Sequence, residues 1–273
     1  MNLEDIDQTE EICLEAVRQN GCALKDVKNQ TEEMCLIAVK QDGYSLRFVK
    51  EQTEEICLEA VKQDGYALKY VLDQTEEMCL IAVRENGYAL EYVKEQTEEI
   101  CVEAVKQHGM HLWYVREQTH QICLEAVKNC GAILHLIKDQ TEEICWEAVR
   151  SSNNALEYVK EQTEEMCAYA VGKSAHVLRY VRDQTEEICL IAVRKDGFLL
   201  DHVREQTLEI CITAISNPLF HLVEYVEIYD NKIELDMNDE RRCDIIKDPK
   251  MKEICLDLIR GKRFRKTKSA RRS

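Results

Sequence analysis

Apolar residues recur along most of the chain with a fixed period of 22 residues. If the Thr of each Gln-Thr pair is position 1, then Ile or Met at position 4, Cys at 5, Ala at 8 and Val or Ile at 9 form one helical stripe. Leu at position 16 and, with one exception, Val or Ile at 19 indicate a second, shorter helix. Ten repeats follow one another, and they begin at Thr9, Thr31, Thr53, Thr75, Thr97, Thr119, Thr141, Thr163, Thr185 and Thr207. A constant period of this size predicts a solenoid of stacked units.

The ends of each predicted helix carry capping residues. Thr at position 1 is a good N-cap, and the Glu residues that usually follow it suit the positive end of the helix dipole. Gly at position 13 of seven repeats predicts a left-handed cap where the first helix ends. Gln stands directly before each of the ten threonines, at position 22 of the preceding repeat in nine of them, and predicts a ladder of hydrogen bonds to backbone groups of the links.

These features predict an all-α solenoid of ten short αα-hairpin repeats with a C-terminal helical cap. We expect residues 1–228 to hold the repeats, 229–259 to form a degenerate repeat or cap, and 260–273 to be a basic disordered tail. Cys255 lies two periods beyond Cys211, which suggests that the register continues into the cap. The N-terminal end has no comparable cap, so end-to-end self-association is one expected mode of assembly.

The repeat consensus, T-E-E-[I/M]-C-L-x-A-V-[K/R]-Q-[D/N]-G-Y-A-L-x-Y-V-K-[E/D]-Q, resembles a helical repeat family of unknown function. That family is abundant in giant DNA viruses of amoebae and also occurs in some bacteria. The resemblance covers residues 9–228 and departs from the pattern at Pro218. It implies an intracellular viral or microbial repeat protein, and it implies no activity.

Charge divides the chain into an acidic body and a basic tail. The formal net charge is −16, with 36 basic and 52 acidic residues. Eight of the basic residues lie in the last 14 positions, which contain no acid: Arg260, Lys262, Arg263, Arg265, Lys266, Lys268, Arg271 and Arg272. Such a run is typical of a localisation signal or of an arm that binds nucleic acid or an anionic surface. The alternatives are a solubilising tail and a tail that folds onto the acidic body.

Fourteen cysteines raise the question of disulfides or metal. Ten of them occupy position 5, where stacking at about 8–10 Å per layer separates neighbours too far for a disulfide or a shared zinc ion. We therefore interpret them as small buried residues, whereas the off-register Cys22, Cys130 and Cys243 could be exposed. Four of the seven histidines cluster in the middle of the chain without recognisable ligand spacing, so we predict no metal and no cofactor.

Positions 14, 17 and 18 vary between repeats, and positions 14 and 18 carry most of the aromatic residues. One interpretation is that these rings seal neighbouring repeats together. The other is a tyrosine-rich strip for a protein partner, because tyrosine favours interfaces. Trp113 and Trp146 are candidate hot spots, although Trp146 stands at the usually apolar position 6 and is expected in the core. The candidate partner-binding residues are Tyr70, Tyr92, Trp113, Tyr114, Tyr158 and Tyr180.

The sequence contains no phosphate-binding glycine loop, no H-E-x-x-H and no G-x-S-x-G motif, so we predict no catalytic residue and no enzyme. No apolar run is long enough for a membrane span, and the acidic N-terminus lacks a signal-peptide core, which predicts an intracellular protein. The leading hypothesis is a protein–protein interaction scaffold that uses the elongated repeat surface. The alternative is a nucleic-acid-associated or packaging protein that acts through the tail.

Overall fold

The computed structural model describes residues 8–217, 228–229, 232–233 and 241–257. The chain divides into two compact units, Met1–Ser151 and Ser152–Ser273. The division falls at Ser151-Ser152-Asn153, where most other repeats carry a consensus close to Q-[D/N]-G. Both units are built from the same 22-residue repeat, so the predicted all-α solenoid is confirmed.

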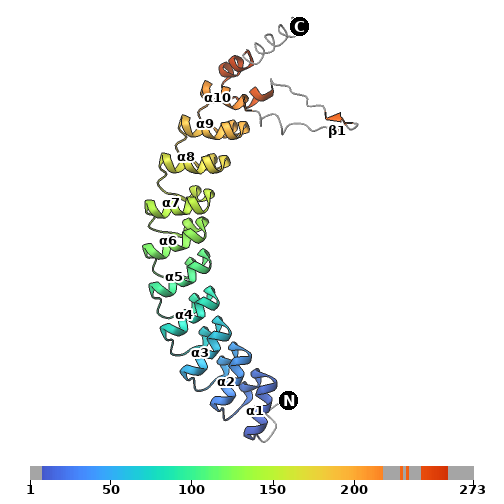
Figure 1. The fold of residues 1–273 in the computed structure, drawn as a ribbon, viewed down its shortest axis with the longest axis vertical. Coiled ribbons are helices and arrows are strands. Elements are labelled where there is room, and N and C mark those ends of the chain that lie inside the picture. Colours follow the sequence, from blue (N-terminus) through green and yellow to red (C-terminus); the bar gives the residue numbers. More distant parts are fainter. Residues whose placement is uncertain (1–7, 218–227, 230–231, 234–240, 258–273) are drawn as a thin grey trace, which may run out of the picture. The chain divides into compact units, whose positions relative to one another are not determined.

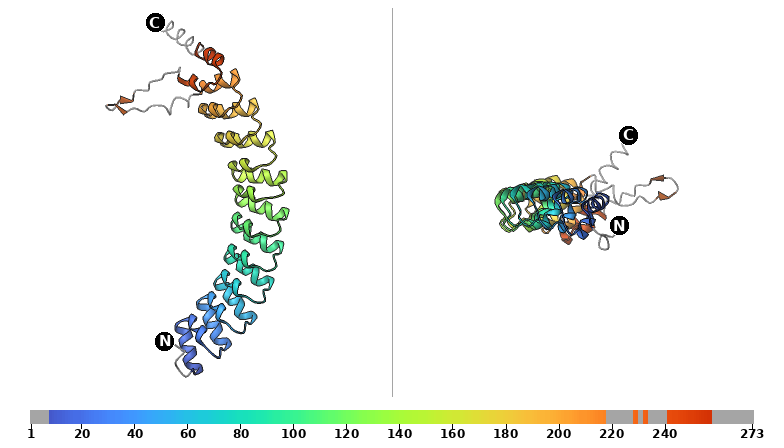
Figure 2. Two further views of the ribbon diagram at one scale, coloured as in Figure 1. Left: turned by 180° about the vertical axis from the view of Figure 1, so that it is seen from behind. Right: turned by 90° about the horizontal axis from the view of Figure 1, so that it is seen from below.

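The first unit alternates ten-residue α-helices with six-residue 3₁₀ helices, labelled η, that lie in chain order (Figures 1 and 2). The sequence predicted a short second helix in each repeat. The structure has a helix there, and its hydrogen bonding is of the tighter 3₁₀ type. The elements are α1 (Glu10–Gln19), η2 (Gly21–Asp26), α2 (Glu32–Gln41), η3 (Gly43–Phe48), α3 (Glu54–Gln63), η4 (Gly65–Tyr70), α4 (Glu76–Glu85), η5 (Gly87–Tyr92), α5 (Glu98–Gln107), η6 (Gly109–Tyr114), α6 (His120–Asn129), η7 (Gly131–Leu136) and α7 (Glu142–Ser151).

The second unit continues the alternation and adds a short hairpin. Its elements are η8 (Asn153–Tyr158), α8 (Glu164–Lys173), η9 (Ala175–Tyr180), α9 (Glu186–Lys195), η10 (Gly197–His202), α10 (Leu208–Ile215), β1 (Ile228–Tyr229), β2 (Lys232–Ile233) and η12 (Arg241–Ile245). The two strands pair antiparallel. Residues 249–257 are again α-helical. No strand was expected from the sequence.

Threonine caps the α-helix of each of the ten repeats in the way the sequence predicts. In all ten repeats the position-4 N–H donates to the threonine Oγ1 at 3.2–3.4 Å. A second cap was missed: an Asn, Asp or His side chain at position 12 accepts the position-14 N–H in six repeats and so starts the η helix. In those six repeats, capping at both helix starts fixes the sharp turn between the two helices.

Glycine at position 13 was expected to form a left-handed cap at the end of the α-helix. This prediction is wrong for the five glycines whose geometry the structure describes. Position 12, rather than 13, ends the α-helix in extended backbone, with φ of −152° at Asp64. None of the five described position-13 glycines, from Gly21 to Gly109, has φ in the left-handed region. A Cβ on Gly65 would instead lie 2.4 Å from the carbonyl oxygen of Ala82. Glycine is needed because the next repeat approaches so closely, with a backbone carbonyl oxygen at four of the five glycines and the His111 ring at Gly87.

The core is made of the positions that the period identified. Within the described repeats, Cys at 5, Ala at 8, Val or Ile at 9 and Leu at 16 are buried throughout. Ile12 in the first repeat is only half-buried, whereas the position-4 residues of the other nine repeats are buried. Each repeat therefore buries its stripe against the next one, as a solenoid requires.

The predicted glutamine ladder is confirmed and is more extensive than expected. Gln96 Nε2 donates to the carbonyl oxygens of Leu90, 3.2 Å away in its own repeat, and Tyr114, 2.9 Å away in the next. Its Oε1 accepts the Arg116 N–H at 3.0 Å and the Cys101 thiol at 3.7 Å. One amide thus satisfies backbone groups of two successive repeats. We call this arrangement the link clamp.

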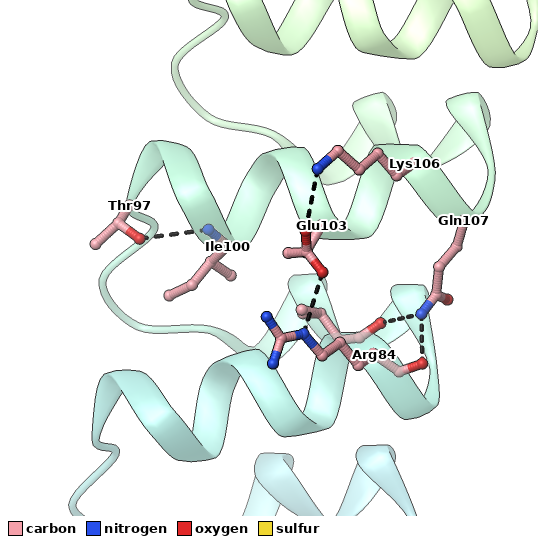
Figure 3. A network of polar contacts seen from close by, with 7 residues as sticks. Arg84, Thr97, Ile100, Glu103, Lys106 and Gln107 are labelled. Atoms are coloured by element: carbon pink, nitrogen blue, oxygen red, sulfur yellow. Dashed lines mark hydrogen bonds and ion pairs between the residues drawn. The ribbon is translucent and has the colours of Figure 1, made fainter.

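A second amide contact joins the C-terminal ends of successive α-helices, and the sequence did not predict it. Gln107, at position 11, donates from Nε2 to the carbonyl oxygens of Val83 and Arg84 at 2.7 and 2.5 Å (Figure 3). Its Oε1 accepts the Gly87 N–H at 2.9 Å. Beside it, Glu103 bridges Arg84 and Lys106, and these hydrogen bonds hold the pKa of its carboxyl below the usual value.

The tenth repeat is completed by η12. Gln206 binds the carbonyl oxygen of Ile245 and the N–H of Lys247, the two groups that its link clamp requires. The separation from Gln206 to its carbonyl acceptor is 39 residues instead of the usual 18, so 21 extra residues separate the two halves of this repeat. The sequence register had assigned that second half to residues 219–226, which lie outside the described residues.

Cys255 is buried, like the cysteines of the ladder, and lies near enough to Cys211 to contribute to raising the pKa of its thiol. Asp248 caps the last described helix, since its Oδ1 accepts the N–H groups of Lys250 and Met251. Cys255 therefore lies seven residues after its cap, whereas each cysteine of the ladder lies four residues after threonine. Its offset from the helix cap therefore differs from that of the ladder cysteines. How far a repeat or cap extends over 229–259 stays a prediction.

Candidate interaction surface

The cysteines form buried rungs rather than a reactive site. All fourteen are free, and the ten at position 5 are buried. Burial raises the pKa of several of these thiols, including Cys57 and Cys101, to about 11. Cys22 and Cys130 are partly exposed as expected, but Cys243 is buried, which corrects that expectation. Within the described residues, no group of three or more His, Cys, Asp or Glu side chains is placed to hold a metal ion.

The variable positions lie on the η helices. Residues three apart in a 3₁₀ helix lie on the same face, so positions 14 and 17 of each repeat point the same way. Tyrosine side chains at positions 14 and 18 of successive repeats meet edge to face with ring centroids 6.0 Å apart, and the pairs are Tyr44–Tyr70, Tyr66–Tyr92 and Tyr88–Tyr114. Such contacts stabilise neighbouring repeats by roughly 0.5–1.5 kcal/mol per pair beyond area burial. The rings therefore have the packing role that was one of the two interpretations.

Cations at position 17 lie over several of these rings. The Arg47 guanidinium lies 4.5 Å from the ring centroid of Phe48, and the Lys69 ammonium lies 5.4 Å from that of Tyr92. In the second unit, Arg179 lies 4.6 Å from the ring centroid of Tyr180 and donates to its hydroxyl at 2.8 Å. These rings are thus already occupied by cations of the chain.

His111 makes the fifth repeat different. It stands at position 15, where the preceding four repeats have Ala or Ser, and it is buried. Its Nδ1 lies 2.8 Å from the Ala104 carbonyl oxygen, and its ring meets Tyr88 edge to face with centroids 4.7 Å apart. Desolvation lowers the pKa of His111, so the ring is held neutral. The imidazole fills space next to Tyr88 that a methyl group leaves open next to Tyr44 and Tyr66.

An exposed apolar patch lies beside this histidine. Trp113 is 69% exposed, Tyr88 47% and Met110 44%. Met110 and Trp113 are three residues apart in η6 and share a face, and the half-buried Tyr114 contacts Tyr88. We call Tyr88, Met110, Trp113 and Tyr114 the Trp113 patch. Large exposed aromatic side chains of this kind mark interaction sites in soluble proteins.

The structure divides the six predicted partner-binding residues among different environments. Tyr70, Tyr92 and Tyr114 are half-buried in the ring pairs of the first unit, and only Trp113 is fully open. Tyr158 and Tyr180 belong to the second unit, and Tyr158 is 38% exposed. Tyr88 and Met110 were not among the candidates, although both occupy the variable position 14.

Trp146 does not lie in the core, contrary to expectation. It is half-buried in α7, and the Arg150 guanidinium lies 5.4 Å from its ring centroid. Position 6 is half-buried in most repeats, so a larger side chain extends outward there. The eight basic residues of the predicted tail, from Arg260 to Arg272, lie outside the described residues.

Hollows lie between successive links, and they are the alternative candidate for a ligand site. One is lined by Gln30, Glu32, Cys35, Lys50 and Thr53 among others, and another by the equivalent positions of the fourth to sixth repeats. These side chains are ones that the fold itself uses. Thr53 Oγ1, for example, donates to Glu32 Oε1 at 3.2 Å, and Lys50 Nζ donates to the Lys28 carbonyl oxygen at 2.7 Å. The hollows repeat with the period and show no feature specific to one ligand.

A sequence profile described as "Domain of unknown function (DUF4116)" matches the chain four times, at residues 9–53, 31–75, 53–96 and 75–118. Each match begins at a position-1 threonine and spans two repeats, so successive matches overlap by one repeat. Over residues 9–118 the chain is therefore similar to a repeat family of unknown function. No curated protein and no solved structure matches the chain. In the part of the chain that the structure describes, no helix is both long and apolar enough to cross a membrane.

Proposed function

We propose that the protein is a non-enzymatic, intracellular scaffold that binds a partner protein through the exposed face of its η helices, with the Trp113 patch as the main contact. The observation that supports this proposal is the exposure of Trp113, 69%, on a face whose other rings are paired or covered. A tryptophan left in water on a rigid repeat surface is the side chain most enriched at binding hot spots.

The invariant positions support the same assignment by exclusion. Position 22 is engaged in the link clamp, and positions 5, 8, 9 and 16 fill the core. Lys or Arg at position 20 caps carbonyl groups of the preceding link, as Arg116 does for Val93 and Lys94 at 2.7 Å. Specific recognition then falls to the positions that vary, as in other solenoids.

The test is affinity capture from the cell that produces the protein, with the full chain and two variants. Trp113→Lys alters the patch while placing at position 17 the residue that Lys25 and Lys69 already show the fold accepts. Leu72→Lys is the matched control, because Leu72 is 64% exposed and stands where the other repeats have Lys or Arg. A partner recovered with the parent and with Leu72→Lys but lost with Trp113→Lys supports the proposal. Equal recovery with all three chains refutes it.

A second candidate function rests on the tail. Eight cations without an acid in the last 14 residues favour association with nucleic acid or another polyanion, as in a packaging protein. Deletion of 260–273 is then expected to remove a steep salt dependence of nucleic-acid binding. If the full-length chain shows no binding at low salt, this candidate fails.

A further inference from the structure

The charge at position 17 changes along the first unit. The first three repeats carry cations there, Lys25, Arg47 and Lys69, and the fourth carries Glu91. The fifth carries Trp113, the first uncharged and non-titratable residue in the column. The cations of this column lie next to aromatic rings, so a change of sign alters what those rings face.

The rings of the Trp113 patch lack such a cation. Tyr92 has the Lys69 ammonium from the preceding repeat. At the equivalent sequence position before Tyr114 the preceding repeat has Glu91, whose carboxylate interacts with the Tyr92 hydroxyl in its own repeat. In the described part of the chain, no Lys or Arg lies over the ring of Tyr88, Trp113 or Tyr114. The Trp113 patch thus has the same tyrosine pair as the preceding repeats but lacks the cation that lies over Tyr92.

Other cations near the patch are already engaged. Arg116 donates to two carbonyl oxygens of the preceding link, and Lys106 and Arg84 pair with Glu103. The two histidines of the region, His108 and the buried neutral His111, contact each other with ring centroids 6.0 Å apart. Glu91 is exposed on the same column, and the chain outside its last 14 residues carries 52 acidic against 28 basic residues. This charge distribution favours a positively charged group at the patch.

We propose that the Trp113 patch binds an arginine or lysine side chain that a partner protein presents next to an aliphatic residue. The cation would lie against the faces of Trp113 and Tyr114, near Glu91, and the aliphatic residue would contact Met110. The partner thereby supplies in trans the contact that Lys69 supplies to Tyr92 within the chain. This inference rests on the proposed function and specifies the chemistry of the contact.

The test uses the full chain with Trp146→Phe, so that Trp113 is the only tryptophan and reports directly on the patch. The probes are a capped peptide, Ala-Leu-Arg-Leu-Ala, and the same peptide with citrulline, which has the shape of arginine without its charge. We expect the arginine peptide to change Trp113 emission and to bind at least about fivefold more tightly than the citrulline peptide. Calorimetry on Trp113→Lys and Leu72→Lys is expected to show loss of binding only for the former.

Three outcomes overturn the inference. Equal affinities for the two peptides would show an apolar site without cation preference. If the arginine peptide does not bind at concentrations of about a few millimolar, the patch is not a binding site for a cationic side chain. Self-association that depends on Trp113 and excludes the peptide would identify a second copy as the occupant. The first and third results leave the capture experiment on the parent chain unaffected, so failure of this inference is distinguishable from failure of the proposed function.

Discussion

Replacing Gln96 with alanine tests whether the link clamp holds the repeats together. The side chain makes two hydrogen bonds to backbone groups of the next repeat, from its Nε2 to the Tyr114 carbonyl oxygen and from the Arg116 N–H to its Oε1, at 2.9 and 3.0 Å. Each polar group left buried without a partner costs about 1–3 kcal/mol. The first of these bonds is part-buried and the second is exposed to solvent, so water can compensate in part. We therefore expect Gln96→Ala to lower the free energy of unfolding by about 2 kcal/mol.

Gln121→Ala is the matched control, because Gln121 is exposed and donates only to Glu125, within one helix, at 3.2 Å. We expect its effect to stay within about 0.5 kcal/mol. Both variants are compared with the parent chain by urea unfolding followed by circular dichroism. Because arrays can unfold in parts, hydrogen exchange at the N–H of Arg116 gives a local reading of the same bond. If Gln96→Ala destabilises the chain no more than Gln121→Ala, the glutamine column is not what fixes the links.

Three further predictions concern other residues. Gly65→Ala places a methyl group 2.4 Å from a backbone oxygen and is expected to destabilise by about 2 kcal/mol or more in urea unfolding, whereas Gly172→Ala, with nothing within 4 Å, should stabilise by about 0.5–1 kcal/mol. Burial lowers the pKa of His111, so as pH falls the histidine is protonated in the unfolded chain before it is protonated in the folded one. The free energy of unfolding should therefore decrease below about pH 6.5. In unfolding measured against pH, His111→Ala should reduce this dependence. The buried thiols of the ladder should resist iodoacetamide in the native state, because burial raises the pKa of several of them to about 11. Mass spectrometry should therefore find Cys22 and Cys130 labelled first.

The period predicted the fold because one chain contains ten aligned copies of its own pattern. Leu at position 16 and Ala at position 8 never change, and wherever the structure describes them both are buried. The threonine caps and the glutamine ladder follow from the same constancy, since a polar residue that is kept at a turn needs a backbone partner. The two units and the 3₁₀ character of the second helix have no such signal in apolar spacing alone.

Glycine was misread because two causes leave the same mark in a sequence. A left-handed cap and a close backbone approach both favour Gly at the end of a helix, and only the carbonyl oxygen of Ala82 next to Gly65 distinguishes them. The Asn or Asp at position 12 was the available clue, because its capping of the η helix at 2.9 Å in Asp64 requires extended backbone there.

The candidate site was located in part. The variable columns identified the η helices and Trp113, but exposure within a column depends on the neighbouring repeat. Tyr88 is open where Tyr66 is half-buried, and Tyr88 contacts the buried His111 ring, which stands at position 15 where the repeat after Tyr66 has Ala89. That coupling between a buried position and an exposed one appears only when the repeats are stacked.

The 21 residues inserted into the tenth repeat have a consequence for how such chains can change. Because η12 still binds Gln206 at the end of the ninth repeat, the second half of the tenth repeat docks on its neighbour although it is not joined to α10 by a short turn. The connection between α10 and η12 therefore accepts extra residues while η12 keeps its hydrogen bonds to Gln206. An engineered insertion at the equivalent turn of another repeat, such as after Asp64, would use the same tolerance.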